Sequence, residues 1–444
     1  MNIRADFTHI TGKIKPMHGI GQPPIMGLTD RYMHYVGEAG MPYSRLHDVG
    51  GAFGGARFVD IPNLFPDFDA DETLPESYDF TFTDWLIEHL MAQNCEPLFR
   101  LGVTIENYFN VKSYRIFPPE DFAKWARICE HVIRHYNEGW ADGFRFGIKY
   151  WEIWNEPEGV YTGVGGACWL GTKEQFFRLY EITANHLKKC FGDSIRVGGY
   201  ASCGWYGHAA DPDCVGIAEP SNNQEYWLTY AHDFLDYISS DEHKAPLDFF
   251  SWHSYAKADE IMKQEDYCRR MLEKHGFGEV EDILNEWNPH HTVENRGTPE
   301  AAAGALAVML AMQKKPVGVL AYYDGRIGTS QYSGLFNPDT WKPYLTYFAF
   351  MSFNQAYRLG DEVDTGSDDD RVFTLGATDG QKRLLLLANT SDKPVEAQFD
   401  IKGADAAGGE ILMIDSVYHY SPTGKRIVNG CLTLPAYSCV EIRM

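Results

Sequence analysis

Short apolar segments alternate with amphipathic segments from about residue 15 to residue 355, and this alternation constrains the fold more than any other feature. The apolar segments have strand length, and the segments between them carry apolar residues at helical spacing, as Phe82, Leu86 and Leu90 do. Strands that alternate with helices predict a parallel sheet. We expect strands at residues 15–25, 42–48, 96–102, 148–155, 195–200, 247–253, 281–286 and 317–324.

Repetition of this unit favours a closed barrel over an open sheet. Eight strand–helix units over about 350 residues are typical of a (β/α)8 barrel, which we place at residues 10–355. An open, doubly wound sheet would need a glycine-rich phosphate loop near its start. The nearest candidate, at residues 19–24, lacks the third glycine and has prolines where a helix should begin. The sequence therefore predicts an α/β fold, a TIM barrel.

From about residue 356 the pattern changes to short strands separated by turn residues. We expect strands at residues 372–376, 383–389, 395–401, 410–415 and 431–434. The Asp-Gly, Thr-Ser-Asp and Gly-Gly turns between them are typical of antiparallel sheets. We therefore predict a C-terminal antiparallel β-sandwich at residues 356–444, an accessory domain completed by residues 1–9.

The composition and net charge of the chain limit the kinds of molecule that it is expected to bind. Apolar residues make up 44% and charged residues 23% of the chain, as in an ordinary globular protein. Asp and Glu outnumber Lys and Arg by 62 to 39, and the formal net charge is −23. A surface of this sign repels phosphate backbones and anionic lipids, so we expect neither nucleic acid nor a membrane as partner. The charge is compatible with a monomer and with a homo-oligomer.

The cysteines indicate a reducing compartment. All 9 are scattered, and no Cys-x-x-Cys pair occurs, so neither a disulfide framework nor a zinc ribbon is indicated. The first residues lack the apolar core of a signal peptide, and there is no apolar run of about 18 residues. We therefore expect a cytoplasmic protein with reduced thiols.

Two glutamates stand at the ends of predicted strands, where a barrel carries its catalytic groups. Glu156 lies in the segment Trp-Glu-Ile-Trp-Asn-Glu-Pro at residues 151–157, and Glu286 ends the strand at residues 281–286. At about 44 residues per unit, the distance between them along the chain corresponds to three units. The strands are then the fourth and the seventh, whose ends face each other across the barrel mouth.

Two carboxyl groups that face each other across a sugar can hydrolyse a glycosidic bond. A separation of about 5–5.5 Å leads to retention of the anomeric configuration and about 6.5–9.5 Å to inversion, and the sequence leaves this choice open. Trp151 and Trp154 flank the first glutamate on alternating sides. An apolar indole beside a carboxyl raises its pKa, as a general acid requires.

Several blocks of the chain resemble glycoside hydrolase family 39, the family of β-xylosidases and α-L-iduronidases. The resemblance covers roughly residues 40–350 and keeps the family's Glu-x-Trp-Asn-Glu-Pro core. It departs at Lys149, Trp151 and Glu158, where the family has Trp, Phe and Asp or Asn. The blocks that carry it are residues 43–48, 78–84, 95–102, 118–136, 152–157, 172–180 and 196–199.

The resemblance implies a retaining exo-glycosidase that acts on plant-type oligosaccharides. Glu156 is then the acid/base, Glu286 the nucleophile, and Asn155 the group that holds the sugar's 2-hydroxyl. A β-D-xyloside is the first expectation, with α-L-arabinofuranosidase, β-galactosidase and β-glucosidase activities as alternatives. The alternative from another class is a non-catalytic carbohydrate-binding barrel. The reaction needs no metal and no organic cofactor.

Further side chains are candidates for the sugar site. Arg45 and His47 match family positions near the glycone, although Arg45 is as well explained by a buried ion pair. The resemblance implies that Tyr255 bonds the nucleophile, whereas His253 is either a sugar contact or structural.

Two aromatic candidates and one histidine pair complete the set. Trp287 is expected as a stacking platform and Tyr323 as a lining of the glycone pocket, with packing in the core as the alternative for both. His131 and His135 stand four apart on a predicted helix, which is ligand spacing. A helix on the outer ring lies far from the mouth, so we expect no zinc there.

Overall fold

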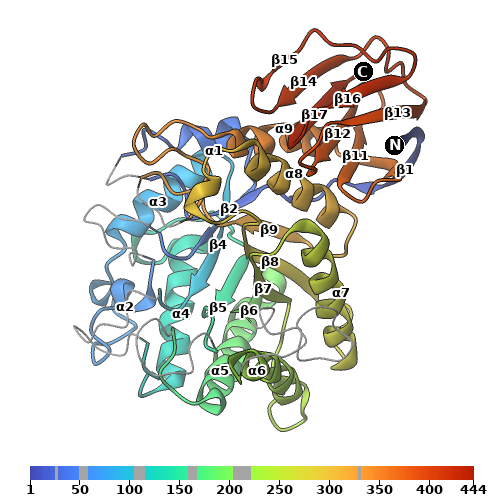
Figure 1. The fold of residues 1–444 in the computed structure, drawn as a ribbon. Coiled ribbons are helices and arrows are strands. Elements are labelled where there is room, and N and C mark those ends of the chain that lie inside the picture. The colour runs from blue at the N-terminus through green and yellow to red at the C-terminus, as the bar shows by residue number, and fades with distance from the viewer. Residues whose placement is uncertain (26–28, 50–58, 105–115, 159–167, 204–221, 329–331) are drawn as a thin grey trace.

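The computed structural model describes residues 1–25, 29–49, 59–104, 116–158, 168–203, 222–328 and 332–444 (Figure 1). Eight parallel strands close into a barrel in chain order from β2 to β9, which confirms the predicted TIM barrel. They are β2 (Gly19–Gly21), β3 (Tyr43–Leu46), β4 (Glu96–Leu101), β5 (Tyr150–Ile153), β6 (Arg196–Ser202), β7 (Phe249–Ser254), β8 (Glu281–Trp287) and β9 (Val319–Tyr322).

Helices surround this barrel (Figure 1). Two short ones, α1 (His34–Glu38) and α2 (Ile61–Leu64), precede the long helices. The long helices are α3 (Thr81–Ala92), α4 (Phe122–Asn137), α5 (Lys173–Phe191), α6 (Asn222–Ser239), α7 (Ala258–Lys274), α8 (Pro299–Gln313) and α9 (Leu345–Leu359). Among the described helices, none is both long enough and apolar enough to cross a membrane.

Local sequence explains where the outer helices begin and which face they bury. Asp121 caps α4, where its side chain accepts hydrogen bonds from the backbone N–H groups of Ala123 and Lys124. Thr172 and Gln175 form a reciprocal capping box at the start of α5. One face of α4 is buried, including Trp125 and Val132, so the helix packs its apolar stripe on the barrel.

A nine-stranded sheet forms the second part of the molecule, in the order β15-β14-β17-β12-β11-β10-β1-β13-β16. It is antiparallel except where β1 and β13 pair in parallel. The strands are β1 (Asn2–Lys13), β10 (Asp361–Ser367), β11 (Val372–Thr378), β12 (Arg383–Asn389), β13 (Val395–Lys402), β14 (Glu410–Ile414), β15 (His419–Pro422), β16 (Cys431–Leu434) and β17 (Ser438–Arg443). The strands β10, β15 and β17 were not predicted.

Helix α8 joins the two parts. Every residue from Ala301 to Gln313 is buried, because the helix packs against α7 and α9 on one side and against β11, β12 and β17 on the other. Its alanines let these neighbours approach closely. The N-terminal strand runs to Lys13 and α9 runs to Leu359, so both extend a few residues past the boundaries expected from the sequence.

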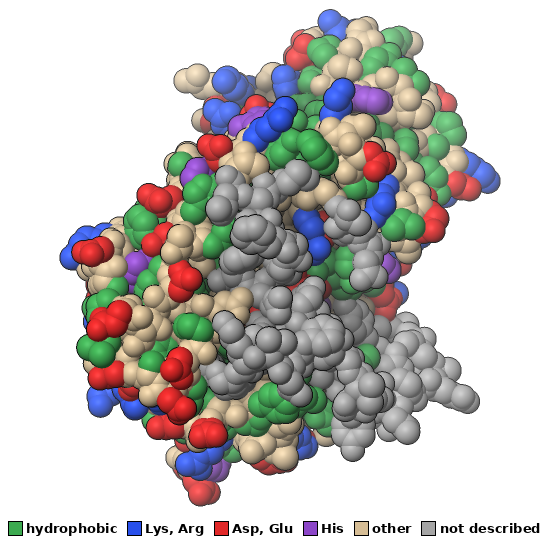
Figure 2. Space-filling view, turned by 90° about the vertical axis from the view of Figure 1, so that its left-hand side faces the viewer, with side chains coloured by type: hydrophobic (Ala, Val, Ile, Leu, Met, Phe, Trp, Pro, Cys, Tyr) green, Lys and Arg blue, Asp and Glu red, His purple; other side chains and the backbone are tan. Residues whose placement is uncertain are grey.

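Charged side chains of both signs cover the outer surface. Figure 2 shows acidic side chains spread over the described part of one face, with basic side chains interspersed among them. This pattern accords with the net charge of −23.

Candidate active site

The two predicted glutamates lie at the carboxyl end of the barrel strands. Glu156 follows β5, and Glu286 is the penultimate residue of β8. Trp154 and Glu156 have φ angles of 73° and 42°, a region that residues other than glycine rarely adopt. The chain therefore turns sharply out of β5, and Pro157 directly follows the turn.

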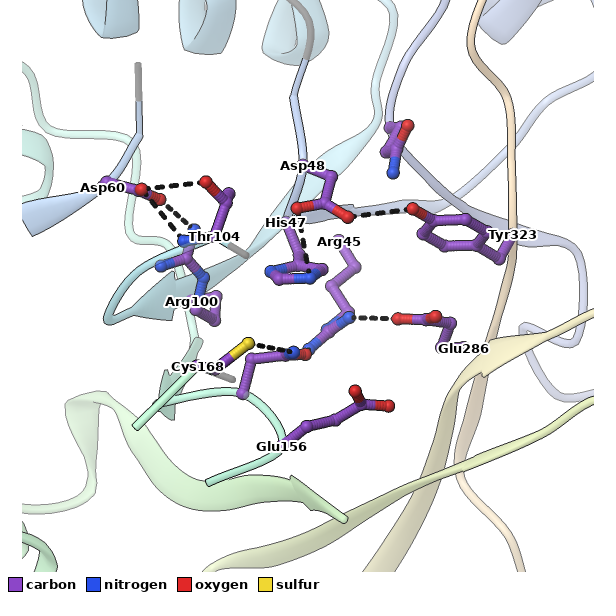
Figure 3. A network of polar contacts seen from close by, with 12 residues as sticks. Arg45, His47, Asp48, Asp60, Arg100, Thr104, Glu156, Cys168, Glu286 and Tyr323 are labelled. Carbon is purple, nitrogen blue, oxygen red and sulfur yellow. Dashed lines mark hydrogen bonds and ion pairs between the residues drawn. The ribbon is translucent and has the colours of Figure 1, made fainter. Parts of the chain in front are cut away.

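The carboxyl groups of the two glutamates lie close together. A carboxylate oxygen of Glu156, one of Glu286 and a ring nitrogen of His253 are all within 4.8 Å of one another. Figure 3 shows the Glu286 carboxyl group beside the Arg45 guanidinium, joined to it by a dashed line, and the Glu156 carboxyl group below both. Hydrogen bonds from other residues of the site fix the positions of both carboxyl groups.

His253 and Tyr255 hold the two carboxylates. The Nδ1 atom of His253 is 2.7 Å from Oε1 of Glu156, and its Nε2 atom is 3.7 Å from Oε2 of Glu286. The hydroxyl of Tyr255 donates to Oε1 of Glu286, the contact that the resemblance implied. Burial lowers the pKa of His253 to about 4, so its ring is neutral at neutral pH.

Burial raises the pKa values of both carboxyl groups above that of an ordinary glutamate. It raises the pKa of Glu156 to about 7, against the opposing charge of Arg45. It also raises the pKa of Glu286, although the charge of Arg45 and the hydrogen bond from Tyr255 oppose this shift. Near neutral pH, Glu156 can therefore carry a proton while Glu286 is held by a cation and a donor.

Arg45 lies next to Glu286 and is 1% exposed. Its Nε donates to Oε2 of Glu152 at 2.8 Å, its Nη1 to Oε2 of Glu286 at 3.2 Å, and its Nη2 to Oδ1 of Asn155 at 2.6 Å. The structure thus places Arg45 in the buried ion pair that the sequence left as an alternative to a sugar contact. The amide nitrogen of Asn155 lies 3.7 Å from Sγ of Cys168.

Glu152 is a residue of the site that sequence reasoning missed. It is fully buried, and its Oε1 accepts hydrogen bonds from the hydroxyl of Ser251 at 2.6 Å and from the side-chain amide of Asn285. Together with Arg45 it forms a charged layer under the reacting groups. The available signal was its place as the first glutamate of the Glu-x-Trp-Asn-Glu-Pro motif, four residues before Glu156, inside an otherwise apolar strand.

A second group of polar side chains lies on the far side of Arg45. The Tyr323 hydroxyl donates to Oδ2 of Asp48 at 2.9 Å, and Nε2 of His47 is 3.3 Å from Oδ1 of the same aspartate. Two buried atoms, Nδ1 of His47 and Nε2 of Gln22, have no hydrogen-bond partner among the described residues. Buried polar atoms of this kind are suited to bind hydroxyl groups of a ligand.

Three tryptophans do not lie where the sequence predicted. Trp287 is fully buried and packs against Tyr322 and Phe350, with ring centroids 5.1 and 6.4 Å away, so its prediction as a stacking platform is wrong. Because Glu286 faces the barrel interior, the next residue of the strand faces the helices. Trp151 and Trp154 are buried as well, and both pack in the barrel–helix layer.

The site contains ligand types that a divalent cation also uses. Glu156, His253 and Glu286 lie within metal-ligand reach of one another. The guanidinium of Arg45, 3.2 Å from Glu286, disfavours a second cation at this position. The arrangement is suited to proton transfer and nucleophilic attack by two carboxyl groups.

Comparison with known proteins agrees with this arrangement. A sequence model described as glycosyl hydrolases family 39 matches residues 68–295. A β-xylosidase of Geobacillus stearothermophilus is 26% identical over 241 residues, which is 51% of this chain and 40% of that protein. The chain matches less than half the length of such curated relatives.

Solved structures share the fold over the whole chain. A glucosidase from Croceicoccus marinus has a TM-score of 0.76 at 18% identity and covers 100% of this chain and 98% of its own. A monomeric β-xylosidase from Caulobacter crescentus CB15 has a TM-score of 0.70 at 17% identity and covers 99% of this chain and 98% of its own.

Proposed function

Because the chain belongs to the glycosyl hydrolases of family 39, we propose that it hydrolyses glycosidic bonds with retention of the anomeric configuration. One observation carries this proposal: a carboxylate oxygen of Glu156 and one of Glu286 lie within 4.8 Å of each other. Retaining enzymes hold their carboxyl groups about 5–5.5 Å apart, whereas inverting enzymes need about 6.5–9.5 Å to admit a water molecule.

The two glutamates have different roles in the first step. Glu156, whose pKa is raised to about 7, protonates the glycosidic oxygen as the leaving group departs. Glu286 attacks the anomeric carbon and forms a glycosyl ester. Arg45 and Tyr255 stabilise the carboxylate form of Glu286 before the attack and hold it in position.

In the second step, water replaces the ester bond. Glu156 is now ionised and accepts a proton from the water that attacks the anomeric carbon. The neutral ring of His253 holds Glu156 in position in both steps when its proton is on Nδ1, because Oε1 of Glu156 then accepts that hydrogen bond. The other carboxyl oxygen is left to exchange a proton with the substrate. Asn155 is the proposed partner of the sugar's 2-hydroxyl.

A terminal β-D-xyloside is the proposed glycone, on plant-type oligosaccharides. The curated relatives, which are named β-xylosidases, support this choice. The structural similarity to a glucosidase makes a β-D-glucoside the second candidate. An α-L-arabinofuranoside is a further candidate, because the solved structures with a similar fold include an α-L-arabinofuranosidase from Bifidobacterium longum. A β-galactoside is the last candidate.

A panel of p-nitrophenyl glycosides tests the proposal. It contains β-D-xylo, α-L-arabinofurano, β-D-galacto, β-D-gluco, β-D-glucurono and α-L-idurono substrates, with Glu156→Ala and Glu286→Ala as controls. We expect release from the β-D-xyloside above all others, and loss of this release in both variants. If nitrophenol is released from another glycoside and this release depends on both glutamates, the proposed substrate changes and the proposed mechanism stands. Release that survives in Glu286→Ala contradicts the mechanism.

A further inference from the structure

We propose that Glu130, His186 and Cys190 form a binding site for a zinc-type divalent metal on the outer wall of the barrel. Glu130 lies on α4, and the other two lie on α5, which packs beside α4 (Figure 1). Thiolate, imidazole and carboxylate are the ligands that zinc takes in proteins. This site is separate from the two glutamates of the barrel mouth and does not depend on the proposed function.

The three ligand atoms already converge on one point. Oε2 of Glu130 lies 2.6 Å from Nε2 of His186, and this nitrogen lies 3.7 Å from Sγ of Cys190. One potential ligand atom of each residue is within 4.8 Å of the other two. Zinc bonds of about 2.0–2.3 Å in tetrahedral geometry separate ligand atoms by roughly 3.3–3.6 Å. The sulfur–nitrogen distance needs almost no change, and the oxygen–nitrogen distance must open by less than about 1 Å.

Helix geometry explains why these residues face one another. His186 and Cys190 are four residues apart on α5, so their side chains lie on the same face of the helix. All three side chains are partly exposed, which leaves room for a water molecule as the fourth ligand. A metal therefore has an entry path that needs no unfolding.

A neighbouring side chain orients the carboxylate. The Nε of Arg134 donates to Oε1 of Glu130 at 2.7 Å, so the second oxygen, Oε2, is the one turned toward His186. Such second contacts fix the direction of a metal-binding carboxylate.

The histidines His131 and His135 on α4, where the sequence predicted no zinc despite their ligand spacing, do not provide an alternative site. The Nδ1 of His131 is bonded to the carbonyl of Arg127. Both ring nitrogens of His135 are occupied, one by the carbonyl of Trp140 at 2.9 Å and the other by Asp84 at 2.8 Å. On α5, in contrast, Nε2 of His186 lies between a carboxylate oxygen of Glu130 and Sγ of Cys190, both of which can bind the same metal.

Metal binding has a defined proton balance. Burial, together with the charge of Glu130, raises the pKa of the Cys190 thiol, so without metal this group stays protonated. When M²⁺ binds, the sulfur–hydrogen bond breaks, a metal–sulfur bond forms, and one proton leaves to solvent. The proton shared by Glu130 and His186 moves to the other ring nitrogen of His186 or to solvent. The metal then ties α4 to α5.

Titration of the full-length chain with Co²⁺ tests the site, because a thiolate ligand gives cobalt a charge-transfer absorption band in the near ultraviolet. We expect saturable uptake of one Co²⁺ with this band, displaced by Zn²⁺. Cys190→Ser should abolish the band, and Glu130→Gln should weaken binding at least tenfold. Cys431→Ser, at another partly exposed cysteine, is the matched control and should keep the band. A wild-type titration without a sulfur band, or a band that survives in Cys190→Ser, overturns the proposal.

Thermal unfolding gives a second readout. Zinc at about a hundred times its Kd should raise the Tm of the wild type by roughly 3 °C and leave that of Cys190→Ser unchanged. Hydrolysis by Cys190→Ser should equal that of the wild type without metal, since this residue lies outside the barrel mouth. Inhibition by zinc without a sulfur band would place the metal on the two glutamates and contradict the site on the outer wall.

Discussion

At the scale of single residues, the surroundings of two glutamates give them different roles, one as the acid and the other as the nucleophile. Glu156 holds a proton up to about pH 7, because burial raises its pKa, whereas Glu286 has a cation and a tyrosine hydroxyl against its carboxylate. Two interacting carboxyl groups titrate as a pair, so their apparent pKa values belong to the site as a whole.

The first prediction concerns the dependence of kcat/KM on pH. Activity should fall above about pH 7, where Glu156 loses its proton. It should also fall at acid pH, where Glu286 gains a proton, and this acid limb should lie above the pKa of an ordinary glutamate, because burial raises the pKa of Glu286. In Glu156→Gln, assayed with an aryl glycoside whose leaving group needs no proton, the fall at high pH should disappear. A basic limb that persists in this variant means that another group is the acid.

The second prediction concerns Arg45. Arg45→Lys keeps the charge but loses the fork that reaches Glu152, Glu286 and Asn155 together, so kcat should fall about 100-fold with little change in KM. Arg45→Met leaves buried carboxylates without a cation and should lower the free energy of unfolding by about 3–5 kcal/mol. Arg4→Met, at an exposed ion pair with Asp364, is the control and should change neither value. Unchanged kcat in Arg45→Lys contradicts its positioning role.

Sequence reasoning found most of the side chains that the structure brings to the mouth. Strand ends and the family motif point to Glu156, Glu286 and Tyr255, because these residues carry a local signal. Glu152 stands in the same motif, but neither it nor Trp287 carries a signal of the face it occupies. Strands of a parallel barrel are apolar on both faces, so alternation does not reveal which face is inside. The first was therefore missed and the second assigned to the wrong side of the barrel.

At the scale of elements, a close approach between two barrel strands requires a glycine. A Cβ atom on Gly198 in β6 would lie 2.1 Å from the backbone oxygen of Phe249 in β7. Gly198→Ala should therefore push the strands apart and destabilise the fold by about 1–3 kcal/mol. Gly12→Ala, at a strand position with no heavy atom within 4 Å, is the matched control. Equal denaturation midpoints for both variants would show that the barrel accommodates the methyl group.

The elements that were predicted and those that were missed differ in their apolar patterning. Barrel strands such as β4 and β8 have apolar residues at their centres and lie between helices, and they were located within a few residues. The strand β10 reads Asp-Glu-Val-Asp-Thr-Gly-Ser and buries only two residues, Val363 and Thr365. Its pairing with β1, which begins the chain, stabilises it, and local sequence cannot reveal such a distant partner.

At the scale of the whole molecule, burial of Glu156 lowers the stability of the folded protein at a pH where this carboxyl group is ionised. The folded protein binds a proton on Glu156 more tightly than the unfolded chain does, because its pKa is about 7 in the fold and 4.5 in the reference state. The stability that this group contributes therefore falls as the pH rises through this window. Glu156→Gln removes the penalty, so it should raise Tm at pH 8 and have little effect at pH 4. A larger gain at the acid end contradicts the direction of the shift.

The central claim is that Glu286 forms a covalent bond with the sugar during hydrolysis. Incubation with 2,4-dinitrophenyl 2-deoxy-2-fluoro-β-D-xyloside slows the second step and should trap that intermediate. Mass spectrometry of the protein and its peptides should then show one fluoroxylosyl group, attached to Glu286. Attachment to Glu156, or release of a product with inverted configuration from an enzyme that never carries the label, would contradict the account.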